Sequence, residues 1–376
     1  MSSKGRVLVA MSGGVDSSVA AVMLKEQGYD VIGITMKTWD YSRVGGKSDK
    51  ETGCCTLESM NDARQIAVKH GFKHFIVDIR DEFGGWVIDR FVEDYMTGHT
   101  PNPCVLCNTH IKWAALLRRA DNLGCDFIAT GHYANVREEN SRYVISRGLD
   151  PGKDQSYALW GVKQKHLART IFPLGSYEKT EIRKMAEEFG LTKVATKPDS
   201  YEICFVPDDD YRRFLKDRVD NLEEKVGGGK FIDQAGNIIG EHEGYPFYTI
   251  GQRRGLNLAL GYPVYVTDIN PETNVITVGE KKDLISTTCR AREINLVKYD
   301  RVPEKEMEVT GAIRYNDDGA IGYLTQIDDD EIRVSFPAGR EAITPGQAVV
   351  CYEGDDIVAG GWIKKVNVDV EALQTA

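Results

Sequence analysis

The spacing of apolar and polar residues divides the chain into two regions with different patterns. Up to about residue 220, short apolar runs alternate with segments whose apolar residues recur at helical spacing. The runs that predict strands cover residues 7–9, 29–36, 74–79 and 126–129. Strands that alternate with helices predict an α/β fold with a doubly wound parallel sheet, whose ligands bind at the carboxyl ends of the strands.

The second region begins near the glycines at 227–229. From residue 230 onward, short alternating runs such as 264–266, 275–278 and 348–352 are separated by turns rich in Asn, Asp and Gly. This punctuation is typical of all-β structure. We therefore predict three parts: an α/β domain over 1–220, a small central β-rich module over 221–281, and a C-terminal β-barrel over 282–376.

Composition adds limits to this picture. The chain has 376 residues, too many for one ordinary core, and it shows neither an apolar run of membrane-spanning length nor the apolar core of a signal peptide. We expect a cytoplasmic, monomeric protein without a membrane partner. The net charge of −10 argues against indiscriminate binding to nucleic acid, although a specific RNA could still be held by local basic patches.

The first predicted strand ends in a glycine loop. Residues 10–17 read Ala-Met-Ser-Gly-Gly-Val-Asp-Ser, and a helical pattern starts at Ser17. Two glycines let the backbone approach an oxyanion closely, and the N-terminus of the following helix favours negative charge. Asp16 would repel a bare phosphate, so we assign it to Mg²⁺ on a pyrophosphate group. The loop lacks the Gly-Lys-Ser/Thr ending of the Walker type.

Three cysteines lie in loops rather than in predicted core. Cys104 and Cys107 form a C-x-x-C pair after two prolines, and Cys204 lies far along the chain, beyond Pro198. We expect the pair to stand just before a helix that begins near Asn108. The N-terminus of that helix would lower the pKa of a neighbouring thiol and make it a better nucleophile.

Four interpretations of these cysteines stay open at this point. A structural zinc site needs a fourth ligand, for which the adjacent Cys54 and Cys55 are awkwardly spaced. Inert buried thiols do not suit Pro/Gly-rich loops. A thioredoxin-type redox module lacks its usual fold here. The fourth interpretation is ATP-linked sulfur chemistry, either on Cys107 and Cys204 or through a cluster on all three thiols.

Family resemblance narrows the choice. The glycine loop resembles the SGGxDS loop of N-type ATP pyrophosphatases, which split ATP into AMP and pyrophosphate while adenylating a carbonyl-type oxygen. Nearly the whole chain resembles the bacterial-type tRNA-specific 2-thiouridylases. The motifs that carry this resemblance, in family order, lie at residues 10–17, 100–103 with 107–108, 129–134, 153–157, 203–205 and 249–253.

The resemblance implies an adenine nucleotide α-hydrolase-like fold and a set of ligands. These are ATP, Mg²⁺, a tRNA with a modifiable wobble uridine, and a sulfur donor, either a cysteine desulfurase or a sulfur-relay protein. Cys107 and Cys204 would be catalytic, with Cys204 carrying a persulfide and a Cys107–Cys204 disulfide forming during turnover. The residues implied in ATP binding are Ala10, Met11, Ser12, Gly13, Gly14, Val15, Asp16 and Ser17 on the phosphates, and Met36 and Gly131 on the adenosine.

The resemblance also implies contacts with the target base and the tRNA. The residues concerned are Asn102, Pro103 and Cys104 for the base, and His132, Lys153, Asp154, Gln155, Arg314, Tyr315 and Gln347 for the tRNA. Without it, Lys153 and Arg314 would be ordinary surface charges, and His132 is as well explained as a structural histidine at a strand end.

Cys104 departs from the family pattern, because some members carry Asp at this position as a proposed general base. A thiol could act as a base only after ionising, so that role is in doubt here. The substitution also creates a trio of Cys104, Cys107 and Cys204. Three thiolates can hold a [4Fe–4S] cluster with one iron open to sulfide, and this remains the alternative to the persulfide route.

Two other functions compete with tRNA thiolation. An amidating synthetase of the GMP or NAD type would share the glycine loop but has no need of Cys107 and Cys204. A non-catalytic RNA-binding module could use ATP as a conformational ligand only. Loss of activity on changing either cysteine would argue against the first, and tRNA-dependent release of pyrophosphate would exclude the second.

Overall fold

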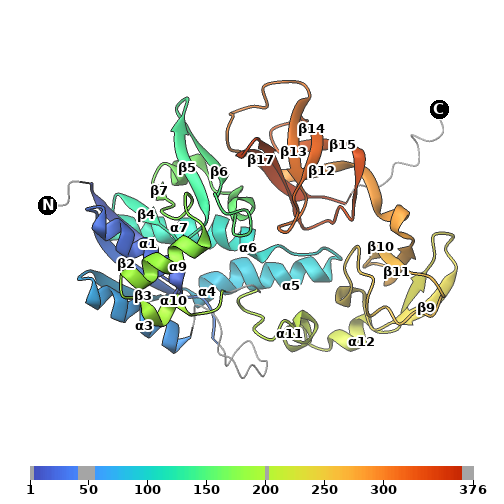
Figure 1. Cartoon of the computed structure of the whole chain (residues 1–376). Coiled ribbons are helices and arrows are strands. Elements are labelled where there is room, and N and C mark those ends of the chain that lie inside the picture. The colour runs from blue at the N-terminus through green and yellow to red at the C-terminus, as the bar shows by residue number, and fades with distance from the viewer. Residues whose placement is uncertain (1–3, 41–55, 200–202, 366–376) are drawn as a thin grey trace. The chain divides into compact units, whose positions relative to one another are not determined.

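The computed structural model describes residues 4–40, 56–199 and 203–365 (Figure 1). It contains two compact units. The first comprises residues 1–92, 103–220 and 355–357, and the second comprises residues 93–102, 221–354 and 358–376. None of the described helices is long and apolar enough to cross a membrane.

The first unit is built on a five-stranded parallel sheet with strand order β3-β2-β1-β4-β7. Its strands are β1 (Arg6–Ala10), β2 (Asp30–Lys37), β3 (Lys73–Asp78), β4 (Phe127–Ala129) and β7 (Thr170–Ile171). The chain leaves β1 toward β3 and later returns to the other side of β1 as β4. The carboxyl ends of β1 and β4 therefore form the topological switch point at which such sheets bind ligands.

Helices and a hairpin complete this unit. The α-helices are α1 (Val15–Glu26), α3 (Leu57–Lys69), α4 (Arg80–Phe83), α5 (Asp89–Met96, which continues into the second unit), α6 (Pro103–Leu106), α7 (Trp113–Asn122), α8 (Gln164–Leu167), α9 (Lys179–Glu188), α10 (Thr192–Ala195) and α11 (Tyr211–Arg218). Two π-helices, η1 (Gly84–Ile88) and η2 (Cys107–Lys112), a 3₁₀ helix, η3 (Ser156–Leu159), and an antiparallel hairpin, β5 (Ala134–Glu139) and β6 (Arg142–Arg147), complete the set.

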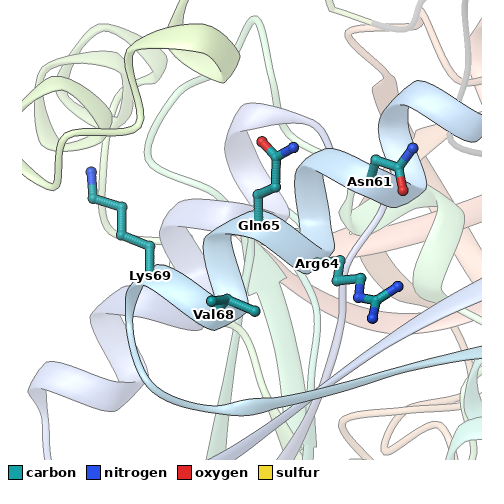
Figure 2. A pocket seen from close by; sticks show the side chains of 5 residues that line it. All are labelled: Asn61, Arg64, Gln65, Val68 and Lys69. Carbon is teal, nitrogen blue, oxygen red and sulfur yellow. The ribbon is translucent and has the colours of Figure 1, made fainter.

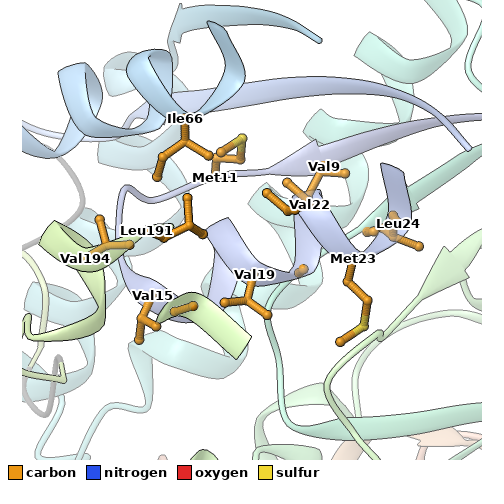
Figure 3. Packing of buried hydrophobic residues seen from close by; sticks show 14 of the residues in the cluster. Val9, Met11, Val15, Val19, Val22, Met23, Leu24, Ile66, Leu191 and Val194 are labelled. Carbon is orange, nitrogen blue, oxygen red and sulfur yellow. The ribbon is translucent and has the colours of Figure 1, made fainter. Parts of the chain in front are cut away.

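Helix α1 lies at the centre of the core. Residues 19–22 and Leu24 are fully buried, and they pack with β1, α3, α9 and α10 (Figure 3). A helix covered on several sides cannot be strongly amphipathic, and the sequence of α1 is apolar nearly all round. Burial of this kind fixes α1, and with it the loop that leads into its first turn.

One predicted helix boundary is wrong. The helix expected to begin near Asn108 begins at Pro103, runs through η2 and continues as α7. Proline is favoured in the first turn of a helix, because its missing N–H has no partner to lose there. Farther toward the N-terminus, η1 separates α4 from α5, so this stretch is not one regular α-helix.

The second unit is mostly β-structure, as predicted. A four-stranded sheet has the order β10-β11-β8-β9, and six further strands close into a barrel because β12 pairs with both β15 and β17. The elements are α12 (Leu222–Val226), β8 (Gly229–Ile232), β9 (Ile238–His242), η4 (Tyr245–Phe247), β10 (Tyr265–Asn270), β11 (Val275–Gly279), η5 (Lys281–Leu284), β12 (Ile285–Leu296), β13 (Met307–Ala312), β14 (Ala320–Gln326), β15 (Glu331–Glu341), β16 (Ala348–Glu353) and β17 (Asp356–Ile363). The predicted fold class, a doubly wound parallel sheet with a β-rich module and a C-terminal barrel, is confirmed.

Candidate active site

The glycine loop between β1 and α1 is shaped by its own serines. The backbone N–H of Ser12 donates to Ser17 Oγ at 3.0 Å, and the two hydroxyl oxygens lie 3.1 Å apart. Gly13 has a φ of +75°, and a Cβ atom there would lie 2.0 Å from the carbonyl oxygen of Ser59. Only glycine fits this position, both for its backbone conformation and for the space available.

The loop presents backbone donors at the switch point of the sheet. Gly14 is the N-cap of α1 and has no side chain to satisfy the first N–H groups of the helix. Those groups have no acceptor within the helix, and the positive end of the helix dipole coincides with them. The geometry fits a phosphate group, and the strand-loop-helix arrangement predicted from the sequence is present.

Gly131 brings the end of β4 against the first turn of α1. A Cβ atom at Gly131 would lie 2.7 Å from the backbone nitrogen of Ser17 and 2.9 Å from the carbonyl carbon of Asp16. The close approach therefore requires glycine. Met36, the other residue assigned to the adenosine, lies near the carboxyl end of the neighbouring strand β2. Both stand at the edge of the sheet where a nucleotide on the loop would lie.

Asp16 is held by two partners from outside the loop. The hydroxyl of Tyr133 donates to Asp16 Oδ1 at 2.7 Å, and Lys179 Nζ contacts both carboxylate oxygens, at 2.7 and 2.8 Å. Burial and the adjacent Asp16 raise the pKa of Tyr133, so its hydroxyl remains a donor. A partly exposed carboxylate beside an anion-binding loop suits Mg²⁺, which prefers oxygen ligands shared with phosphates.

Asp199 extends this ion pair into a network that the sequence analysis missed. Its carboxylate contacts Lys179 at 2.9 Å, Lys153 at 2.7 Å and Arg183 at 2.9 Å. Burial raises the pKa of Asp199, but hydrogen bonds and charge from Lys153 and Lys179 outweigh this effect and hold it at about 2. Asp16 and Lys153 belong to motifs named above, whereas Lys179, Arg183 and Asp199 lie outside every such motif.

Lys197 supplies a further cation next to the loop. Its Nζ donates to the carbonyl oxygen of Gly13 at 3.2 Å and lies 2.6 Å from Asp62 Oδ2. Asp62 is buried and also contacts Lys193 at 2.7 Å. Burial raises the pKa of Asp62, and the two lysines lower it further than burial raises it. Lys179 and Lys197 thus contact the loop directly, and each is also held by a carboxylate outside it.

The C-x-x-C pair lies inside a helix and not before it. Cys104 is the second residue of α6 and Cys107 the first residue of η2. Cys104 is exposed, yet the surrounding protein raises the pKa of its thiol, and the positive charge of Lys112 offsets only part of this increase. The pKa of Cys104 is therefore raised, where a lowering was expected, because desolvation outweighs the positive charge of Lys112. Cys104 is a poor thiolate near neutral pH.

Cys204 is presented at the surface by a turn with a buried anchor. The N–H of Val206 donates to the carbonyl oxygen of Ile203 at 2.9 Å, which places exposed Cys204 in the turn. The next residue, Phe205, is almost fully buried. Its ring contacts those of Phe83, Phe91 and Phe214, with centroid distances of 5.8, 5.1 and 5.4 Å. An exposed thiol on an anchored turn suits a sulfur carrier.

The described residues contain no group of three Cys, His, Asp or Glu side chains arranged to hold a metal ion. This geometry gives no support to a structural zinc site or to a preformed cluster on Cys104, Cys107 and Cys204. Cys54 and Cys55, considered as further zinc ligands, lie outside the described residues. The roles of Cys107 and Cys204 and the disulfide between them stay predictions.

The residues of the first unit assigned to tRNA make mostly internal contacts. The side chain of Asp154 accepts hydrogen bonds from the backbone of Gly148 and from Ser156, and Gln155 bonds to the backbone of Tyr133. These contacts shape the turn after the β5–β6 hairpin. Lys153 belongs to the Asp199 network.

His132 is a buried residue with neighbours on several sides. Its Nδ1 lies 2.7 Å from Thr130 Oγ1, its Nε2 lies 3.4 Å from Lys112 Nζ, and its ring packs against Trp113 and Phe172. Burial, with a smaller effect from Lys112, holds the pKa of His132 well below its ordinary value, so the ring is neutral. This environment fits the structural explanation of His132, and the assigned tRNA contact stays a prediction.

In the second unit, Gln347 fixes the segment that carries Asn102. Its amide nitrogen donates to the carbonyl oxygens of Thr100 and Pro101, at 3.1 and 3.0 Å. Asn102 is buried, as is Pro103, which belongs to the first unit. Arg314 and Tyr315 are exposed in the loop between β13 and β14, where a large partner could reach them.

A shallow hollow on the surface of α3 lies apart from all these residues. It is lined by Asn61, Arg64, Gln65, Val68 and Lys69, which come from this one helix (Figure 2). None of the five belongs to the glycine loop or carries a candidate thiol. We assign no function to this hollow.

Comparison with known proteins covers the whole chain. Models of three families match it: the tRNA methyl transferase HUP domain at residues 5–208, the tRNA methyl transferase PRC-barrel domain at 212–280, and the aminomethyltransferase beta-barrel domain at 286–363. The tRNA-specific 2-thiouridylase MnmA of Salinibacter ruber is 67% identical, with 100% of this chain and 99% of that protein covered.

Two further relatives carry the same name. The protein of Cytophaga hutchinsonii is 60% identical, with 97% of this chain and 98% of the relative covered, and that of Amoebophilus asiaticus is 58% identical, with 96% of each covered. The family models speak of methyl transfer, whereas these relatives are named for 2-thiolation. We give the relatives more weight, since they match over nearly their full length at high identity.

Proposed function

Because the chain belongs to the family of tRNA-specific 2-thiouridylases, we propose that it converts the wobble uridine of tRNA to 2-thiouridine in an ATP-dependent reaction. The observation that carries this proposal is the glycine loop at the switch point of the sheet, with Asp16 beside it. The enzyme is a transferase that releases AMP and pyrophosphate, and it works in the cytoplasm as a monomer.

Activation of the base is the first step. The loop N–H groups bind the phosphates of ATP, and Asp16 would hold Mg²⁺, which would neutralise phosphate charge. The uridine leaves the anticodon stack, which costs least for a loop base that is already unpaired. Its C2 oxygen attacks the α-phosphate and pyrophosphate leaves. The C2 carbon thereby becomes electrophilic, and its oxygen becomes part of a leaving group, AMP.

Sulfur transfer is the second step and belongs to the two cysteines. A cysteine desulfurase or a relay protein loads Cys204 as a persulfide, and the terminal sulfur attacks C2 while AMP departs. Cys107 then attacks the Sγ of Cys204, so the bond between the two persulfide sulfurs breaks and the new C2 sulfur is freed. Alternatively, Cys107 attacks first and releases sulfide, which attacks C2. Both routes leave a Cys107–Cys204 disulfide, which an external thiol must reduce.

Recognition of the tRNA is assigned to both units. Asn102, Pro103 and Cys104 contact the target base, while Lys153 and the exposed Arg314 and Tyr315 contact the tRNA. The side chains of Asp154, Gln155 and Gln347 contact the protein's own backbone, and Asp154 also contacts Ser156 and Arg147. We assign these three residues, together with His132, to contact with the tRNA as well, as the family resemblance implies.

The test is a product analysis with matched cysteine variants. The purified protein is incubated with substrate tRNA, MgATP, cysteine and a cysteine desulfurase, and the digested tRNA is examined by mass spectrometry. Wild type, Cys104→Ser and Cys204→Ser are compared, both iron-free and after anaerobic cluster reconstitution. The persulfide mechanism predicts 2-thiouridine without iron from wild type and from Cys104→Ser, and none from Cys204→Ser.

Two other results have definite meanings. Product that appears only after reconstitution, and is lost in both variants, would replace the persulfide with a cluster on the three thiols. No product from wild type under either condition, with activity on a small acid and ammonia instead, would favour an amidating synthetase.

A further inference from the structure

The ion pair between the buried Lys179 and the partly exposed Asp16 has no role in the steps above. We propose that Lys179 is a nucleotide-binding residue whose ammonium group leaves Asp16 for the phosphates when Mg²⁺ takes its place on the carboxylate. This inference rests on the proposed function, since it concerns the same nucleotide loop. It assigns to Lys179 a task that neither the glycine motif nor the family resemblance gives it.

The backbone of Lys179 is fixed so that its side chain can reach the loop. Lys179 is the first residue of α9, whose N-terminus is closed by a capping box between Glu178 and Glu181. Its N–H donates to Asp150 Oδ2 at 3.0 Å, and its side chain is only 9% exposed. Because its backbone is fixed and its side chain is buried, the ammonium group of Lys179 can reach only a few anionic partners. Here the ammonium group stands on Asp16, two residues beyond Gly14.

The charges around Lys179 are balanced. Asp16, Asp199 and Asp150 contribute three negative charges, while Lys153, Lys179 and Arg183 contribute three positive charges. A divalent cation on Asp16 would add two positive charges and repel the ammonium group from that carboxylate. Phosphate oxygens on the loop would compensate this charge. Lys179 needs only to turn from one oxygen anion to another nearby.

Asp199 makes the exchange possible without leaving a buried charge alone. Lys179 contacts the carboxylates of both Asp16 and Asp199. Asp199 also forms ion pairs with Lys153 and Arg183, so it stays paired when Lys179 turns away. A simple structural tie between α1 and α9 would not need this redundancy. The contrast gives a distinction that can be measured. If Lys179 changes partners, its removal weakens nucleotide binding only when Mg²⁺ is present. If Lys179 is only a structural tie, its removal weakens nucleotide binding equally with and without the metal.

The experiment measures the affinity of an ATP analogue with a methylene bridge between the α- and β-phosphates, by calorimetry, in Mg²⁺ and in EDTA. The variants are Asp16→Asn, Lys179→Met and their combination. The matched control is Lys193→Met, a lysine of α10 that also contacts two carboxylates, Glu58 and Asp62, but whose side chain is 59% exposed. Thermal unfolding of each variant is recorded to confirm that it folds.

The proposal predicts that the effect of Lys179→Met on analogue affinity depends on Mg²⁺. In Mg²⁺, Lys179→Met weakens binding about tenfold or more, equivalent to about 1.4 kcal/mol, and Lys193→Met changes it less than twofold. In EDTA, Lys179→Met changes binding less than twofold, because the wild-type ammonium group stays on Asp16. Asp16→Asn binds about tenfold more tightly than wild type in EDTA, and the double variant loses this gain.

Three results would overturn the proposal. The first is equal binding of wild type and Lys179→Met in Mg²⁺. The second is an equal loss in both media, which indicates a structural tie. The third is a gain from Asp16→Asn that persists in the double variant, which indicates relief of repulsion alone. If Lys179→Met does not fold, Asp16→Asn in EDTA decides, since affinity no higher than wild type contradicts the exchange. A wild-type protein that binds no analogue would overturn the proposed function as well.

Discussion

Gly131 offers a sharp test of how closely the nucleotide loop is fitted to the sheet. We predict that Gly131→Ala weakens ATP binding about tenfold or more while the protein stays folded. The new Cβ atom would lie 2.7 Å from the backbone nitrogen of Ser17, and an ordinary contact requires at least 3.4 Å. The first turn of α1 would therefore have to move by about 0.7 Å.

The size of the expected loss of affinity depends on which atoms can move away from the new methyl group. The atoms that the new methyl group meets are backbone atoms of Asp16 and Ser17, and the helix behind them is buried on several sides. Overpacking of this kind costs about 1–3 kcal/mol. Because each 1.4 kcal/mol is a factor of about ten in affinity, a strain relieved by shifting the loop N–H groups costs roughly one to two powers of ten in binding.

The assay is calorimetric titration with a non-hydrolysable ATP analogue, together with thermal unfolding. Gly84→Ala is the matched control, because Gly84 has helical φ and ψ of −55° and −58° and nothing lies within 4 Å of its added Cβ atom. We expect that variant to bind normally and to be as stable as wild type or slightly more stable. Analogue affinity for Gly131→Ala within twofold of wild type would refute the reasoning about this contact.

Three further predictions concern other parts of the molecule. Phe205→Ala should leave tRNA-dependent pyrophosphate release intact but lower 2-thiouridine formation, because a cavity that costs about 3–5 kcal/mol of stability loosens the turn that carries Cys204. Phe205→Leu should lower 2-thiouridine formation less. An equal loss of pyrophosphate release and 2-thiouridine formation would contradict this prediction. Glu331 has a pKa held at about 2, since burial raises it but hydrogen bonds from Lys364, Arg292 and Arg290 lower it more. Its stabilisation is therefore fully present above about pH 4.5 and is lost as the pH falls through about 2. Urea unfolding of Glu331→Gln should therefore differ from wild type by at most about 3 kcal/mol at pH 7 and by less than about 1 kcal/mol at pH 2. His132→Asn, which can keep the bond to Thr130, should leave the pH profile of thiolation between 5.5 and 8 unchanged, because the ring is already neutral there; a lost inflection in that range would assign His132 a titrating role.

The local parts of the fold and site could be predicted from the sequence. The strand before the glycine loop and the helix after it lie within two residues of the expected bounds, because a buried apolar run and a helical repeat are local signals. The start of the helix at Pro103 was placed five residues too late. Proline suits the first turn of a helix, so the two prolines before Cys104 are compatible with this earlier start.

Lys179 and Lys197 could not be predicted as site residues, because their contacts join segments far apart in the sequence. Lys179 contacts Asp16 across 163 positions of sequence, and Lys197 contacts Gly13 across 184 positions. Such pairs depend on how α9 and α10 pack on α1, which no single stretch of sequence specifies. The pKa of Cys104 was misjudged for the same reason. The helix terminus that would lower it is visible in the sequence, but the surrounding protein that raises it is not.

The central claim is that the nucleotide loop activates the uridine and Cys204 then delivers sulfur. The most direct measurement follows pyrophosphate and 2-thiouridine in one reaction of Cys204→Ser with tRNA, MgATP and a loaded sulfur donor. We predict tRNA-dependent pyrophosphate release at a rate near that of wild type, with no 2-thiouridine. Formation of 2-thiouridine by this variant, or loss of pyrophosphate release from a folded protein, would contradict the separation of the two steps.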